Sequence, residues 1–273
     1  MSNRGERELE CLYTVKKDII LEPNMHTFWF GTTNEDIKNV KAAFSQAVPN
    51  HNANNFPDFI CNDAIIEHFQ ITSSKETARG SKCEQTHRSF ERETVAKTEE
   101  IKDFYYERKL PPEGVLFRFD EDSVQHSHDF LKDSFKRCWN KHSASLKKYT
   151  GDRKLTIFLV EYQDRALLMA EQTHGNISAD VFFSYELRFP NSLFYRISCD
   201  KELLTWIQSN SNGVDFVVFR GYDKKDNEIV DRIEIVSVSH IAEMLSFLPW
   251  KIEIYSSSPR ISNLLFGWSN EIR

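Results

Sequence analysis

The sequence has few cysteines, and none of them belongs to a C-x-x-C pair. The five cysteines are odd in number and dispersed along the chain, at Cys11, Cys61, Cys83, Cys138 and Cys199. Disulfide frameworks and cysteine zinc sites both use cysteines at short, regular spacings. The pattern therefore indicates reduced thiols and predicts neither a disulfide scaffold nor a zinc site.

Long apolar runs are also missing. No apolar stretch approaches the length that crosses a membrane, and the first ten residues, MSNRGERELE, contain no apolar signal core. We therefore expect a cytoplasmic protein without a membrane partner.

The chain lacks an excess of positive charge. Its formal net charge is -6 at pH 7, so no global basic field exists to attract nucleic acid. A G-x-S-x-G elbow, a P-loop and a G-x-G-x-x-G turn are absent as well. A nucleic-acid function would therefore depend on a local basic face, and the usual serine-hydrolase and nucleotide-binding motifs do not apply.

The composition is that of a folded protein, with 40% hydrophobic and 13% aromatic residues. Periodicity and turn signals predict one α/β domain over residues 1–273, with a central mixed sheet flanked by helices. Residues 73–110 form a charged insertion in this scheme. Helices are expected at 34–47, 124–149, 201–209 and 241–247. Strands are expected at 11–21, 26–31, 115–119, 154–162, 181–189, 193–198, 214–221 and 229–238.

The most distinctive stretch, residues 55–72, predicts two short strands joined by an Asn62-Asp63 turn. Asp58 stands at the start of the first strand. Glu67 lies in the second strand, in an apolar row with Ile65 and Phe69, because side chains alternate across a strand. A carboxylate in such a row is costly unless a cation, a proton or several donors meet it. Two converging carboxylates would suit Mg²⁺, which can activate water and stabilise the leaving oxygen of a phosphodiester.

A purely structural alternative exists for both residues. Pro-Asp is a common opening of a turn before a strand, and Glu67 could lie at an exposed sheet edge or pair with a lysine. In that case the hairpin would be only part of the framework.

Pro57-Asp58 followed by Glu67 in the next strand resembles the PD-(D/E)XK nuclease superfamily, which has the restriction-endonuclease-like fold. The expected order of elements is similar to the α-β-β-β-α-β core of that family over residues 30–165, leaving 166–273 as a C-terminal sheet and helix extension. The resemblance implies that Asp58 and Glu67 hold Mg²⁺, or Mn²⁺ in its place.

The chain departs from the family motif at one position. The family lysine should follow the glutamate by two residues, where this sequence has Phe69. Substitutes are Gln70, Lys75 and a basic residue further on, such as Lys82 or Lys132. Gln70 projects from the opposite face of a regular strand and would need a bulge to reach the carboxylates.

The expected helix 124–149 provides a local basic face. Its candidate contacts to DNA are Lys132, Lys136, Arg137 and Lys141; a solvated helix surface is the alternative. His128 and His142 fall on its apolar face and are expected to be satisfied core histidines.

These features together predict a metal-dependent phosphodiesterase that acts on DNA, with Asp58, Glu67, Gln70 and Lys75 as candidate catalytic residues. One alternative is a catalytically degenerate nuclease-fold protein that binds nucleic acid or protein. The other is an unrelated α/β interaction protein. A homodimer is left open.

Overall fold

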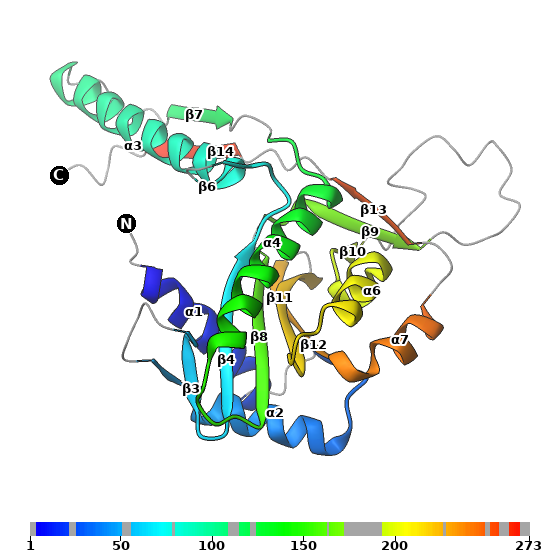
Figure 1. Cartoon of the computed structure of the whole chain (residues 1–273). Coiled ribbons are helices and arrows are strands. Elements are labelled where there is room, and N and C mark those ends of the chain that lie inside the picture. The colour runs from blue at the N-terminus through cyan, green and yellow to red at the C-terminus, as the bar shows by residue number, and fades with distance from the viewer. Residues whose placement is uncertain are drawn as a thin grey trace, which may run out of the picture.

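The computed structural model has a seven-stranded mixed sheet at its centre, which confirms the predicted α/β class (Figure 1). The structure describes residues 4–21, 26–50, 56–77, 80–108, 115–120, 124–162, 164–171, 193–225, 228–248, 252–256 and 262–267. In spatial order the strands of the sheet are β1 (Thr27–Phe30), β12 (Glu228–Ser237), β11 (Phe216–Lys225), β8 (Leu155–Tyr162), β4 (Ala64–Ile71), β3 (Phe59–Cys61) and β2 (Val48–Pro49).

The sheet mixes parallel and antiparallel pairs. The β2, β3 and β4 strands form an antiparallel meander, and β8 then runs parallel to β4. On its other side β8 is parallel to β11, which forms an antiparallel hairpin with β12. The predicted C-terminal extension therefore continues the same sheet, and the apolar strand β8 occupies its centre.

Helices cover both faces of the sheet (Figure 1). On one face, α4 (His128–Lys148), α6 (Lys201–Ser209) and α7 (Ile241–Phe247) pack in one apolar cluster with alternate residues of β4 and β8, such as Phe69 and Phe158. On the opposite face, α1 (Arg4–Lys16) and α2 (Asn34–Gln46) form a second cluster with the intervening strand residues.

Local sequence signals explain where several helices begin. Thr33 caps α2, and its side chain and that of Asp36 form a reciprocal capping box. Ser127 caps α4 by accepting from the Phe130 N–H, so this helix begins four residues later than the predicted Val124. Asp200 caps α6, whose bounds are those predicted.

The strand predicted at 11–21 is wrong. This segment is the end of α1 and the short π-helix Lys17–Leu21. Cys11, Leu12, Val15 and Ile19 recur at helical spacing and are buried against the second cluster. Because polar residues lie between them, the same apolar residues also fit a weak strand-like alternation. Packing against the sheet selects the helix.

The remaining elements lie outside the main sheet. The charged insertion contains a small ladder, β5 (Glu76–Thr77) with β6 (Gly80–Ser81), and the long helix α3 (Lys82–Arg108). Near the C-terminus, β13 (Ile252–Ser256) pairs with β9 (Leu167–Glu171), and β14 (Ser262–Gly267) pairs with β7 (Val115–Asp120). Leu193–Phe194 is the short strand β10, followed by a 3-10 turn at Ile197–Cys199. The strand predicted at 181–189 lies outside the described residues.

Among the helices of the described segments, none combines the length and apolarity needed to cross a membrane.

Candidate functional site

The hairpin of β3 and β4 places Asp58 directly across from Glu67. Asn62 adopts a positive φ of 41° in the two-residue turn, a conformation that asparagine tolerates better than most residues. Phe59 pairs with Ile66 in the ladder, so the next pair outward joins Asp58 and Glu67. The predicted hairpin and the predicted convergence of its two carboxylates are both present.

Backbone hydrogen bonds hold the two carboxylates side by side. The Asp58 N–H donates to Glu67 Oε2 at 2.9 Å, and the His68 N–H donates to Asp58 Oδ2 at 2.8 Å. Each strand therefore orients the acid of the other through its own backbone. We call Asp58 and Glu67 the carboxylate pair.

His142 of α4 is the third member of this site. Its Nδ1 forms a hydrogen bond with Glu67 Oε1, and its ring stacks on Phe69 with centroids 5.1 Å apart. Glu67 itself is 5% exposed. The alternative in which Glu67 lies at an exposed edge or pairs with a lysine is therefore wrong, whereas the expectation of a satisfied core histidine at 142 is confirmed. The sequence did not show that its partner is the glutamate of the hairpin.

Burial perturbs both acids in the same direction. It raises the pKa of Asp58 to about 6, and the neighbouring Glu67 charge adds to this effect. Burial also raises the pKa of Glu67 to about 7, although the hydrogen bonds from Asp58 oppose the shift. At neutral pH the pair thus holds negative charge that the surrounding protein does not fully compensate. A bound divalent cation would compensate it.

No lysine of the described residues pairs with the carboxylate pair. Within the described parts of the chain, neither acid forms an ion pair with a lysine or arginine, and the motif position is filled by the buried ring of Phe69. Gln70 lies on the opposite face, because β4 pairs regularly with β8 from Ala64 to Ile71 and has no bulge. The structure does not bring Gln70 to the pair.

The other predicted lysine substitutes are also remote or engaged. Lys75 is exposed and lies beyond the end of β4. The four steps along the strand from Glu67 to Ile71 alone span about 13 Å at the usual rise of a strand. Lys82 is the exposed first residue of α3. Lys132 binds Glu202 at 2.6 Å and Asp129 at 3.0 Å. None of these three lysine side chains contacts Asp58 or Glu67.

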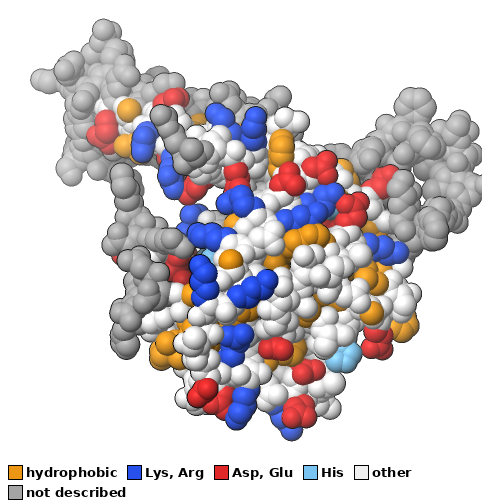
Figure 2. Space-filling model, in the orientation of Figure 1, with side chains coloured by type: hydrophobic (Ala, Val, Ile, Leu, Met, Phe, Trp, Pro, Cys, Tyr) orange, Lys and Arg blue, Asp and Glu red, His pale blue; other side chains and the backbone are white. Residues whose placement is uncertain are grey.

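The basic face of α4 is present but partly neutralised. Figure 2 shows Lys and Arg side chains gathered over the front of the molecule, where α4 lies, with acidic side chains among them. Arg137 forms an ion pair with Glu76, and Lys136 lies 5.8 Å from the ring centroid of Trp206. Lys141 is exposed, next to His142 in the chain. Of the four predicted DNA contacts, Lys141 is the one without such an engagement among the described residues.

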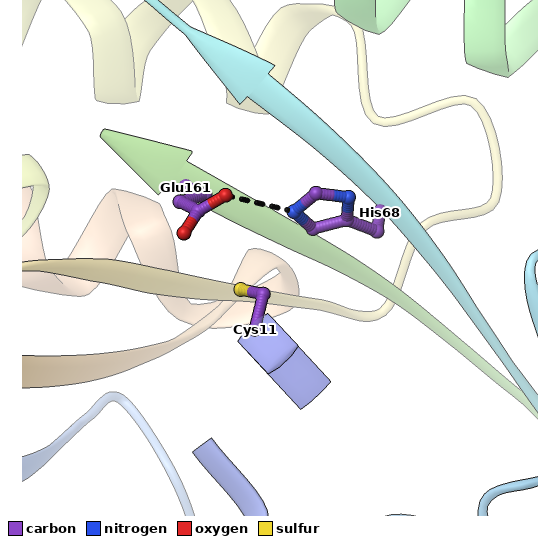
Figure 3. Close-up of side chains that lie close together, drawn as sticks. All are labelled: Cys11, His68 and Glu161. Atoms are coloured by element: carbon purple, nitrogen blue, oxygen red, sulfur yellow. Dashed lines mark ion pairs between the residues drawn. The ribbon is translucent and has the colours of Figure 1, made fainter. Parts of the chain in front are cut away.

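A second buried polar cluster lies on the opposite face of β4, between the sheet and α1. It contains Cys11, His68 and Glu161 (Figure 3). Burial lowers the pKa of His68, but Cys11 and Glu161 beside it outweigh this effect and raise the pKa to about 10. Sequence reasoning missed this cluster, although the acid at the end of the apolar run Leu155–Tyr162 is a signal of a buried charge.

Comparison with known proteins does not add a relative. The chain matches no protein-family model, no curated protein and no solved structure at a significant level.

Proposed function

We propose that the protein is a metal-dependent phosphodiesterase that acts on DNA and is similar to the PD-(D/E)XK nucleases. The observation that carries the proposal is the buried carboxylate pair, whose pKa values near 6 and 7 indicate an uncompensated negative site. Perturbed acids that converge in this way are typical of functional sites. Ordinary framework acids form ion pairs with lysine or arginine, whereas among the described residues the only ionic partner of this pair is His142.

The order of elements supports the resemblance. The chain runs through α2, β2, β3, β4, α4 and β8, with the charged insertion between β4 and α4. This is the α-β-β-β-α-β order that the resemblance implies. Asp58 precedes the middle strand of the meander and Glu67 lies in the third, as the motif requires.

The donor set of the pair fits Mg²⁺ or Mn²⁺. Both acids offer carboxylate oxygens, which hard divalent cations prefer, and Mg²⁺ usually takes one or two protein carboxylates and keeps its other positions for water and phosphate. Asp58 and Glu67 would hold the ion, which supplies an activated water and stabilises the leaving oxygen when bound. His142 orients the Glu67 carboxylate from α4, and the exposed Lys141 lies next to it in the sequence to meet a phosphate.

A catalytically degenerate nuclease-fold protein is the second candidate. The observation that favours it is Phe69, a core ring at the position of the family lysine, so that no ammonium group of the described residues lies beside the pair. Such a protein would bind the metal and DNA without cleaving the backbone.

Cleavage assays separate these candidates. We expect the wild-type protein to cleave plasmid or single-stranded DNA with Mg²⁺ or Mn²⁺ and not with EDTA. Asp58→Asn and Glu67→Gln should each lower the rate at least about 100-fold, because a metal ion contributes several kcal/mol to such reactions.

Asp63→Asn is the matched control for these variants. Asp63 is an exposed acid of the same hairpin that pairs with Lys154 at 2.7 Å, and its loss should leave the rate unchanged. Metal binding without cleavage by the wild type would support the degenerate alternative. Cleavage that both carboxylate variants retain would refute the assignment of the site.

A further inference from the structure

Three potential metal ligands meet inside the protein on the face of β4 that points away from the carboxylate pair. Cys11 comes from α1, His68 from β4 and Glu161 from β8 (Figure 3). One ligand atom of each lies within 4.8 Å of the other two, and the residues are 0%, 6% and 1% exposed, respectively. A thiol, an imidazole and a carboxylate at this separation can surround one ion.

The His68 side chain directs its Nε2 atom into this cluster, where its nearest charged neighbour is Glu161. Its Nε2 lies 3.4 Å from Glu161 Oε2, and no atom of the described residues meets Nε2 in hydrogen-bond geometry. A ring nitrogen that is fully buried without a hydrogen bond is costly. Figure 3 shows that the ring points into the space between Glu161 and Cys11.

Two further residues fix the carboxylate of this cluster. Arg220 Nη1 donates to Glu161 Oε1 at 2.9 Å, and Arg220 Nε donates to Asp231 Oδ1 at 3.0 Å. Such outer contacts orient a metal ligand. The charges also balance, since a dication neutralises a thiolate and a carboxylate while Asp231 neutralises Arg220.

We propose that Cys11, His68 and Glu161 bind a zinc ion that fastens α1 to the central sheet. Zinc takes sulfur, nitrogen and carboxylate ligands together in tetrahedral sites, whereas Mg²⁺ and Ca²⁺ avoid thiolates. The three side chains leave one tetrahedral position for a water molecule or another small ligand. Because the cluster is buried, the ion stabilises the structure and does not meet a substrate.

A cysteine nucleophile activated by His68 is a weaker explanation of the same residues. Cys11 is 0% exposed, so no substrate reaches its sulfur. In a nucleophilic triad the acid and the thiol also approach different ring nitrogens. Here the acid approaches Nε2, the nitrogen that points toward Cys11.

Cobalt substitution of the full-length protein tests the site without an activity assay. Protein stripped with a chelator should bind one Co²⁺ per chain with a thiolate-to-cobalt charge-transfer band, and Zn²⁺ should displace it. Cys11→Ser should lose the band, and both Cys11→Ser and His68→Gln should weaken zinc binding at least about 10-fold. Cys138→Ser is the matched control, because Cys138 is a buried free cysteine on α4, across the sheet.

The expected result is one tight zinc per chain that depends on Cys11 and His68 and not on Cys138, with a higher melting temperature when zinc is present. The absence of a thiolate band in the folded wild-type protein would overturn the proposal. Equal zinc binding by wild type and both ligand variants would also overturn it. If Cys11→Ser does not fold, the wild-type cobalt spectrum alone decides.

Discussion

Phe69→Lys is expected to destabilise the protein by about 4 kcal/mol, because truncating a buried aromatic ring costs about 3–5 kcal/mol and burying a charge adds to the loss. Phe69 is 4% exposed. Its ring packs edge-on against Phe135 and Phe158 at centroid distances of 5.9 and 5.6 Å. The new ammonium group would have Glu67 two residues away on the same strand face, which offsets part of the cost.

Urea unfolding of the purified variants measures this effect. Phe69→Leu, which keeps an apolar side chain of smaller size, should cost only about 1–2 kcal/mol. If Phe69→Lys folds with wild-type stability, the site can accommodate a lysine at this position. If Phe69→Lys is destabilised as expected, the hydrophobic core requires an apolar side chain at position 69.

The carboxylate pair should make stability depend on pH in a way that its amide variants remove. The pKa values of Asp58 and Glu67 rise on folding from 3.8 and 4.5 to about 6 and about 7. The folded state therefore holds protons that the unfolded state has lost, and the stability they provide falls as pH rises through the folded values. Wild-type protein should lose this contribution progressively from about pH 4 to about pH 7, so a large part of it is lost between pH 5 and pH 8.

Asp58→Asn and Glu67→Gln should each be more stable, relative to wild type, at pH 8 than at pH 5. One pKa unit corresponds to about 1.4 kcal/mol, so we expect a relative gain of about 1 kcal/mol for Asp58→Asn and about 2 kcal/mol for Glu67→Gln. Both amides can still accept the backbone hydrogen bonds of the pair.

Denaturant unfolding at the two pH values gives these differences directly. A mutant-minus-wild-type difference that stays constant with pH, or that becomes more destabilising at pH 8, would mean that the acids are compensated by groups of the protein. Acids that lower stability and yet are required for cleavage are the signature of a functional site.

Local signals were sufficient to predict the hairpin and several helices. The Asn62-Asp63 turn and side-chain alternation predicted β3 and β4, and the helix predicted at 34–47 corresponds to α2, which Thr33 caps. The strand prediction for residues 11–21 was wrong because the apolar residues of this segment fit a helix and a weak strand pattern almost equally well. Packing of Cys11 and its neighbours on the sheet selects the helix.

The surroundings of the site could not be predicted in the same way. His142 meets Glu67 across 75 residues of sequence, and Arg137 is neutralised by Glu76 from another element. No spacing rule covers contacts that tertiary packing creates. Cys11 and Glu161 are likewise far apart in the chain and meet only because α1 packs on β4 and β8.

Binding of Mn²⁺ tests the central claim most directly, and electron paramagnetic resonance counts the bound ion. The Cys11→Ser background removes one of the three ligands of the Cys11, His68 and Glu161 cluster and so weakens metal binding at that cluster. We expect one Mn²⁺ per chain, lost in Asp58→Asn and in Glu67→Gln and retained in Asp63→Asn. Absence of binding, or equal binding by all of these variants, would contradict it.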